Sequence, residues 1–237
     1  DVGGKIQNMA IEKTSLAKKW IFDTNPLKSG VKVGDFFRVS SCIATLLNEA
    51  FVLKNCRFDD DYCYTDNGKI ERTLIKKAAS PKNKKYKRDD EYIIFPYYYD
   101  SNGLLSHYNE QEMGEKYPCA IQYLNSFRKK LDDRKSDKTA KWYEYGRSQA
   151  LQNANKEMIL ISSVVSACTN AYLLGKEEIP YSGLYIIPTG NIPLSKLLLQ
   201  LNSEAFITHI SKVGVCVSGQ SKRITPQDIE SFVCDLN

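Results

Sequence analysis

The sequence of 237 residues contains only two histidines, and no two of its seven cysteines are separated by two residues. Zinc sites use closely spaced cysteines and histidines, so a zinc site is not expected. The odd number of cysteines and the absence of a secretion signal favour reduced thiols in a cytoplasmic protein. Apolar runs fall far short of the roughly 20 residues that span a bilayer, which excludes a membrane protein.

Signatures of common catalytic sites are also missing. The glycines form no phosphate-binding loop, because none is followed by Lys-Ser or Lys-Thr at the required spacing, and there is no Gly-x-Ser-x-Gly turn. One acidic pattern, Asp100 followed by Asp133 and Lys135, has the residue types of a metal-dependent nuclease. It falls in a charged stretch at a helix end, so a nuclease is kept only as an alternative function.

Positive charge is concentrated in one segment. Nine basic residues and a single acid, Glu71, lie between Lys69 and Arg88, although the net charge of the whole chain is only +5. A second basic excess runs from Arg128 to Lys141. Clustered lysine and arginine neutralise phosphates and release counterions, which is the sequence-independent part of nucleic-acid binding. A solvated loop that keeps the protein soluble is the alternative interpretation.

Strand and helix signals alternate irregularly, which predicts an α+β fold rather than a regular βα repeat. A hairpin turn is predicted at 66–68, and strands are predicted at 31–39, 43–53, 91–95, 158–165, 183–187 and 213–217. Helices are predicted at 9–21, 70–79, 118–134, 194–201, 203–214 and from 225 onward. The length allows two lobes, for which the predicted ranges are 31–118 and 119–237.

The most unusual stretch is 142–149 (WYEYGRSQ), in which three aromatic rings stand beside an arginine and a glutamine. Arginine can form two hydrogen bonds with guanine and glutamine two with adenine, while aromatic rings can stack on bases. Large aromatic residues more often serve packing. The competing interpretation therefore places Trp142 and Tyr145 in a core, with Arg147 paired to Glu144.

Five segments recur in an order typical of one family. They are 43–53 (IATLLNEAFVL), 70–97 with its closing IIFPY, 123–134, 142–149 and 199–224. In this order they resemble the C-terminal target-recognition region of TaqI-like adenine-specific DNA methyltransferases, including those fused to nucleases as type IIG restriction-modification enzymes. One departure is Cys42, which stands where the family usually has glycine before Ile-Ala-Thr.

The resemblance implies a module that positions double-stranded DNA for an adenine-methylating domain located upstream in the same polypeptide. The S-adenosylmethionine site would lie in that domain, and this chain would be non-catalytic, with no cofactor or metal of its own. Accordingly, Asn25-Pro26-Leu27 lacks the second proline and the aromatic residue of the family's catalytic Asn-Pro-Pro-Tyr motif. Residues 1–30 would be a connector or the tail of that domain, and 31–237 the target-recognition domain.

The charge pattern and the resemblance together give the candidate DNA-binding residues. Phosphate contacts are predicted for the Lys-rich segment, through Lys76, Lys77, Lys82, Lys84, Lys85, Lys87 and Arg88. Contacts to bases or backbone are predicted for Trp142, Tyr143, Tyr145, Arg147, Ser148 and Gln149, and a second contact set for Lys222 and Arg223. A specificity-subunit-like scaffold that holds protein partners is the alternative from a different functional class.

Overall fold

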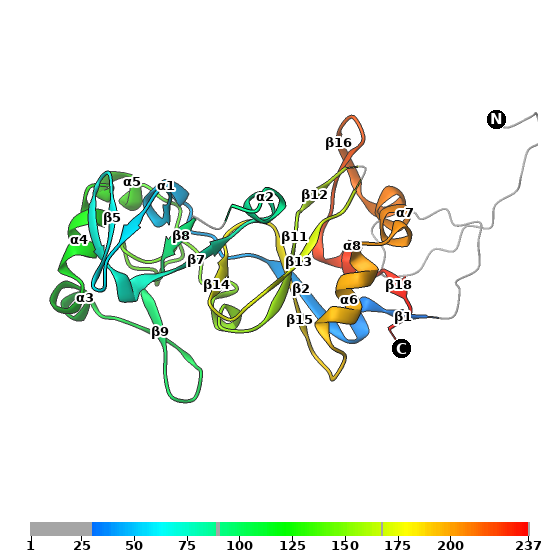
Figure 1. Cartoon of the computed structure of the whole chain (residues 1–237), viewed down its shortest axis with the longest axis horizontal. Coiled ribbons are helices and arrows are strands. Elements are labelled where there is room, and N and C mark those ends of the chain that lie inside the picture. The colour runs from blue at the N-terminus through cyan, green and yellow to red at the C-terminus, as the bar shows by residue number, and fades with distance from the viewer. Residues whose placement is uncertain (1–29, 89–90, 167, 237) are drawn as a thin grey trace, which may run out of the picture.

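The structure, a computed structural model, describes residues 30–88, 91–166 and 168–236. This part of the chain is elongated, with two lobes and the short helix α2 (Pro81–Lys85) between them (Figure 1). Helices and strands are mixed without a βα repeat, which confirms the α+β class predicted from the sequence. The helix predicted at 9–21 lies outside the described residues. No helix among the described residues is long and apolar enough to cross a membrane.

The second lobe is built on an antiparallel sheet whose strands are almost wholly buried at its centre. The strand order is β13 (Ala171–Leu174), β11 (Met158–Ile161), β15 (Leu184–Pro188) and β2 (Phe37–Ser41). Every residue of β11 is buried and apolar, as expected for a strand covered on both faces. The same lobe contains α6 (Leu194–Leu201), α7 (Glu204–Val213), α8 (Pro226–Glu230) and the pair β1 (Val31–Lys32) and β18 (Val233–Cys234).

The first lobe combines two small sheets with a group of short helices. One sheet has the order β14 (Glu178–Pro180), β7 (Ile75–Ala79), β8 (Tyr92–Ile94) and β3 (Val52–Leu53), and the other has β4 (Arg57–Phe58), β5 (Tyr62–Thr65) and β6 (Gly68–Glu71). The helices are α1 (Asn48–Phe51), α3 (Glu110–Lys116), α4 (Pro118–Asn125) and α5 (Arg128–Asp132). A hairpin of β9 (Tyr97–Tyr99) and β10 (Leu105–His107) projects from this lobe (Figure 1).

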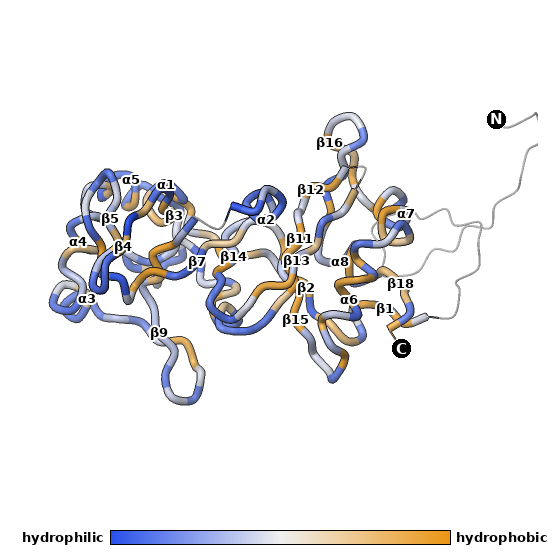
Figure 2. The backbone as a smooth tube through the Cα atoms, viewed as in Figure 1, coloured by the Kyte–Doolittle hydropathy of each residue, from blue (hydrophilic) through white to orange (hydrophobic). Residues whose placement is uncertain are grey.

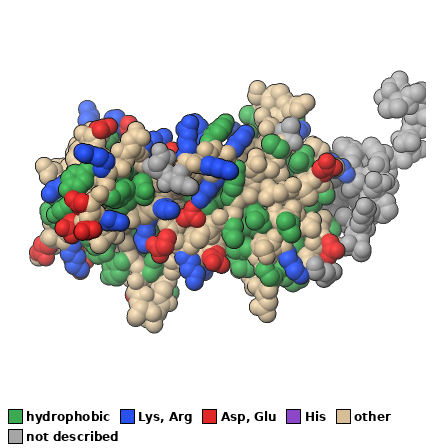
Figure 3. All heavy atoms as spheres, in the orientation of Figure 1, with side chains coloured by type: hydrophobic (Ala, Val, Ile, Leu, Met, Phe, Trp, Pro, Cys, Tyr) green, Lys and Arg blue, Asp and Glu red, His purple; other side chains and the backbone are tan. Residues whose placement is uncertain are grey.

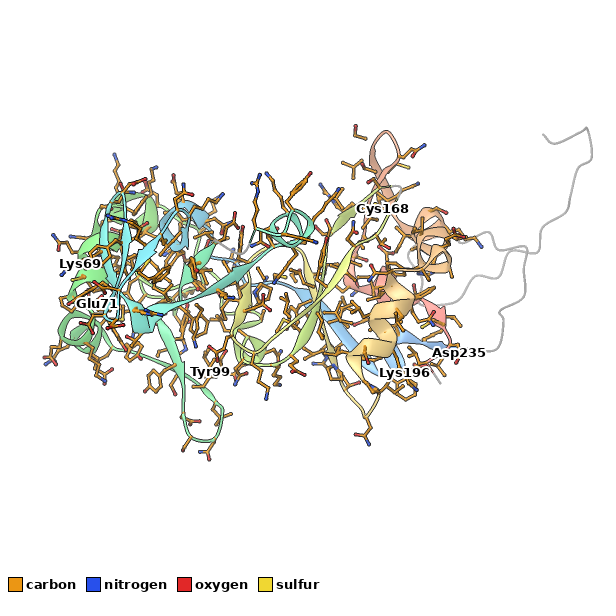
Figure 4. The ribbon with its side chains drawn as sticks, in the orientation of Figure 1. Lys69, Glu71, Tyr99, Cys168, Lys196 and Asp235 are labelled. Carbon is orange, nitrogen blue, oxygen red and sulfur yellow. The ribbon has the colours of Figure 1, made fainter. Side chains whose placement is uncertain are left out.

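One carboxylate joins the small sheet to the helices of the first lobe. Glu71, at the end of β6 and labelled in Figure 4, accepts hydrogen bonds of 2.8 Å from the backbone N–H groups of Cys119 and Ala120. These donors lie in the first turn of α4, where unpaired N–H groups and the helix dipole favour a negative charge. The one acid of the basic segment is therefore occupied in the fold.

Two main clusters of buried side chains fill the lobes, and Figure 2 shows the corresponding apolar strands in orange. The first cluster takes residues from 43–154 together with Ile179, and the second takes residues from 33–39 and 159–236. The predicted boundary between the two lobes falls at 118/119. Helix α4 begins at Pro118 and continues beyond that boundary, and its buried side chains belong to the first cluster. Each cluster also includes a segment from the other end of the chain. Strand β2 pairs with β15 in the second lobe, and β14 pairs with β7 in the first.

Several helices begin and end where the sequence predicts. The helix predicted at 194–201 is α6, and Ser203 accepts a hydrogen bond from the Phe206 N–H to cap α7, which ends before Gly214. Thr225 and Asp228 form the reciprocal bonds of a capping box at the start of α8. The predicted turn at 66–68 joins β5 and β6 as a hairpin.

Two other predictions are wrong. The helix predicted at 70–79 is instead the end of β6, a 3-10 turn at Arg72–Leu74, and β7. Ile70, Leu74 and Ala78 recur at helical spacing, but pairing of β7 with both β8 and β14 decides the conformation. The strand predicted at 43–53 is mostly irregular, with α1 inside it and only β3 at its end.

Candidate nucleic-acid interface

The Lys-rich segment, predicted as a loop, begins with the helix α2. Ser80 accepts a bond of 3.1 Å from the Asn83 N–H, and Asn83 in turn accepts one of 2.8 Å from the Ser80 N–H. Pro81 occupies the first helical position, where its missing N–H costs nothing. The buried Asn83 amide also donates to the Ala78 carbonyl at 2.9 Å, which fixes α2 against the end of β7. The local sequence therefore anchors α2 and leaves its lysines on the outside.

Not every basic residue of this segment is available to a ligand. Lys76 is paired with Glu177 and Lys84 with Glu178, so acids from the start of β14 neutralise two of the predicted phosphate contacts. The remaining basic residues predicted to contact phosphates are exposed, and none forms an ion pair within the described part of the chain. They are Lys77, Lys82, Lys85, Lys87 and Arg88. Figure 3 shows Lys and Arg side chains gathered over α2 in the middle of the visible face.

A depression of about 300 Å³, which we call the α2–β12 groove, separates α2 from β12 (Val164–Val165) and β13. Lys82, Lys85 and Tyr86 form one wall, while the other consists of Ser162, Val164, Val165, Ser166, Cys168, Asn170 and Tyr172. Burial raises the pKa of Tyr172, so its hydroxyl stays protonated and neutral. The groove is thus basic on one side and polar and uncharged on the other.

The second predicted basic pair lies next to this groove. Strand β17 (Ser221–Arg223) pairs with β12, which places Arg223 opposite Val164 and Lys222 opposite Val165. Lys222 contacts the Cys216 sulfur at 2.9 Å, and Arg223 is exposed. One basic set therefore lines the groove, and the second, far away in the sequence, lies on the strand paired with the groove strand β12. Lys77 does not join them, because it borders a separate depression with Arg72.

Tyr86 was not predicted as a functional residue. Its side chain is 58% exposed and borders the groove, with Lys85 and Arg88 each 5.7 Å from the ring centroid. An exposed aromatic ring among cations is suited to packing against a sugar or a base. The signal in the sequence is a lone tyrosine within a run of lysines, an aromatic residue beside basic ones, as Tyr145 stands near Arg147 in the 142–149 stretch.

The rings of Tyr143 and Tyr145 lie in the core of the first lobe, 0% and 1% exposed. The Tyr145 hydroxyl donates to the Ile94 carbonyl at 2.6 Å, and the Tyr143 hydroxyl donates to the Tyr108 carbonyl at 3.0 Å. Phe51 packs edge-on to Tyr145 at a centroid distance of 5.1 Å. Both rings therefore serve packing, the role that the competing interpretation gives to Tyr145, and neither presents an exposed face to a base.

The remaining members of this stretch are held by protein partners. Trp142 donates to Glu110 at 3.0 Å, and the Arg128 guanidinium lies 4.2 Å from the centroid of its ring. Gln149 donates to the Cys42 carbonyl at 3.3 Å, at the position where the family usually has glycine.

Arg147 is paired with Asp137 at 2.8 Å, not with Glu144, whose buried carboxylate bonds to His107 at 2.9 Å. Ser148 bonds to the other oxygen of Asp137 through its N–H, at 2.9 Å, and through its hydroxyl, at 3.2 Å. Ser148 also lines a depression of about 240 Å³ that shares no lining residue with the α2–β12 groove.

Asp137 gives a test of this local network. The Ser148 N–H and then the Arg147 guanidinium hold the pKa of its carboxyl below the ordinary value of 3.8. The carboxylate therefore contributes stability that is fully present above pH 3.8 and is lost as the pH falls through the folded-state pKa. Thermal melts of wild type should show a fall in Tm over that acid range that Asp137→Asn reduces. An equally steep fall in the variant would contradict this role.

The acids of the nuclease alternative do not form a common site. The Asp100 carboxylate accepts from the Asn102 and Leu104 N–H groups inside the β9–β10 turn, at 2.8 and 2.9 Å. Asp133 is exposed at the end of α5. Within 30–88, 91–166 and 168–236, no three His, Cys, Asp or Glu side chains are grouped as metal ligands.

Comparison with known proteins gives a class: the chain is similar to type II restriction-modification enzymes. It is 24% identical to the type II restriction enzyme and methyltransferase RM.Eco57I of Escherichia coli in an alignment of 146 positions that covers 54% of the chain. Its fold matches part of the type IIL restriction-modification enzyme MmeI, whose structure is a complex with DNA. That match has a TM-score of 0.55 and 11% sequence identity over 96% of the chain.

The matches support the resemblance predicted from the sequence and cover only part of each relative. The resemblance to a type II restriction enzyme and methyltransferase, predicted from the order of the five segments, is confirmed. No family model matches the chain. The chain spans 14% of the length of RM.Eco57I and 31% of the MmeI chain.

Proposed function

We propose that the chain is the target-recognition region of a type II restriction-modification methyltransferase and that double-stranded DNA lies across the α2–β12 groove. The proposal rests mainly on the placement of exposed basic residues around one open groove: those of α2 line it, and Arg223 lies on β17, the strand paired with the groove strand β12. None of these basic residues has a carboxylate partner among the described residues, so they could bind phosphates without breaking an ion pair. The complex of MmeI with DNA supports this proposal by analogy.

The groove residues would take different roles on the duplex. Lys82, Lys85, Lys87 and Arg88 would contact phosphates, which positions the protein without reading sequence. Arg223 would do the same from the opposite side. Arg147, Ser148 and Gln149 stay a predicted second set, in which Arg147 would have to leave Asp137 before it could contact a base.

The rest of the enzyme would lie outside this chain. We propose that residues 31–237 act as one recognition unit, with 1–30 as a connector to an adenine-methylating domain in the same polypeptide. The short span of RM.Eco57I that the chain matches supports this division of labour. Such an enzyme would meet its DNA in the cytoplasm.

The described residues do not fit S-adenosylmethionine, the cofactor implied for the parent enzyme. This cofactor is a sulfonium cation, and the depressions beside α2 and β7 are bordered by Lys82, Lys85, Arg72 and Lys77. The acids of the third depression, Asp137 and Glu144, already accept bonds from protein donors. We therefore assign the cofactor to the proposed upstream domain and derive no step through it.

Titration of a fluorescein-labelled duplex with the 237-residue chain at several salt concentrations tests the proposed function. Each neutralised phosphate contributes about −0.9 to the slope of log affinity against log salt, so four or five groove cations predict a slope of roughly −4. The scaffold alternative predicts weak binding with little salt dependence. Absence of binding at about 50 mM salt, or a slope near zero, would exclude the proposed groove function.

A further inference from the structure

A two-stranded hairpin projects from the second lobe on the same edge of the molecule as α2 (Figure 1). It consists of β16 (Val215–Ser218) and β17, joined by the two-residue turn Gly219-Gln220. Gly219 has a φ of 53°, and no atom lies within 4 Å of the position where a Cβ would stand. The tip of this hairpin therefore extends into solvent and covers no core.

The strand β16 of this hairpin is exposed along its whole length. All four residues of β16 are exposed, with Val215 at 52% and Val217 at 50%. Gln220, at the tip, is also exposed. An exposed edge strand with apolar side chains is a liability for aggregation unless another molecule covers it.

The surroundings of the hairpin indicate which kind of molecule would cover it. Strands β12, β17 and β16 form one sheet in that order, so the hairpin continues directly from the wall of the α2–β12 groove. Cys168, another residue of that wall, lies near the base of the hairpin in Figure 4. Lys222 and Arg223 lie in β17 itself. A molecule bound in this basic groove would be a polyanion, and it would meet the hairpin next.

We infer that the β16–β17 hairpin enters the major groove of bound DNA and that Gln220 reads the edge of an adenine. This inference rests on the proposed function. The major groove is about 12 Å wide, admits a two-stranded ribbon, and displays a donor and acceptor pattern that distinguishes adenine, which the minor groove does not. The amide of glutamine can bond both N6 and N7 of adenine, and apolar side chains such as those of Val215 and Val217 can contact the thymine methyl group.

The test uses a duplex selected by the full 237-residue chain from a pool with a randomised centre. Each adenine of the selected site is replaced in turn by 7-deazaadenine, which removes the N7 acceptor from the major groove and preserves base pairing. One replacement should weaken wild-type binding by roughly 5- to 150-fold, the range for loss of a bidentate base contact. Gln220→Ala should weaken binding to the unmodified duplex by a similar factor and should be insensitive to that replacement.

The matched control is Gln227→Ala, which removes an exposed amide from α8. It should bind both duplexes as wild type does, and neither variant should change the salt slope or Tm. Salt-dependent binding that enriches no sequence, or a Gln220→Ala variant that keeps the full sensitivity to 7-deazaadenine, would overturn the inference and leave the proposed function standing. Absence of salt-dependent duplex binding by wild type would overturn both.

Discussion

Replacing Lys82, Lys85 and Lys87 together with alanine is expected to weaken binding to every duplex by a similar factor. Lys82 and Lys85 lie in α2 and Lys87 follows it; all three are exposed and form no ion pair within the described segments. Each lost phosphate contact should flatten the salt slope by about 0.9, which at 0.1 M salt corresponds to roughly eightfold in affinity. Duplex titrations at several salt concentrations measure both quantities. Tm should stay near that of wild type, because the helix cap uses Ser80 and Asn83 instead.

The matched control removes the same charge elsewhere. Lys129, Lys135 and Lys138 are exposed on α5 and in the segment that follows it, within the second basic excess of the sequence. Their replacement with alanine should leave the salt slope close to that of wild type. If the two triple variants lost affinity equally, binding would depend on net charge alone, and the α2–β12 groove would have no special role.

Tyr145→Ala should destabilise the chain by about 3–5 kcal/mol, the range for removing a large buried aromatic side chain. The ring is surrounded by Phe51, Phe95 and Tyr97, and its hydroxyl is bonded to the Ile94 carbonyl. DNA binding by the folded fraction should be unchanged. Denaturant unfolding, followed by duplex titration under folding conditions, separates the two effects.

Tyr145→Phe is the conservative partner of that variant. It keeps the ring and removes only the hydrogen bond to Ile94, so the expected loss is about 1 kcal/mol. If Tyr145→Ala left stability intact and abolished duplex binding, the ring would be a DNA contact, as the 142–149 pattern first suggested.

The features that the sequence predicts best are those that depend on residues close together in the chain. Ser203 and Thr225 cap their helices through bonds to residues three positions away, so the sequence shows the capping partners directly. The helix predicted at 70–79 failed for the opposite reason. Pairing of Ala78 with Ile179 in a parallel ladder decides its conformation, and no local pattern shows a partner so distant in the chain.

The same distinction applies to the candidate interface. The sequence located the basic segment, but Lys76 and Lys84 are neutralised by Glu177 and Glu178, which pairing of β7 with β14 brings close. The position of β17 beside the groove likewise depends on its pairing with β12.

The hairpin residue Gln220 was missed for a related reason. A single polar residue in a Gly-Gln turn has no signal until the fold shows what stands beside it.

Amide hydrogen exchange of the chain, with and without duplex at low salt, tests the groove assignment most directly. We expect slower exchange on DNA binding over 81–88 and 215–223, because those segments would lie against the duplex. Additional slowing over 137–148, which borders a separate depression, would indicate that the predicted second set around Arg147 and Ser148 also contacts the duplex. Protection over 137–148 without protection over 81–88 would contradict the proposed groove.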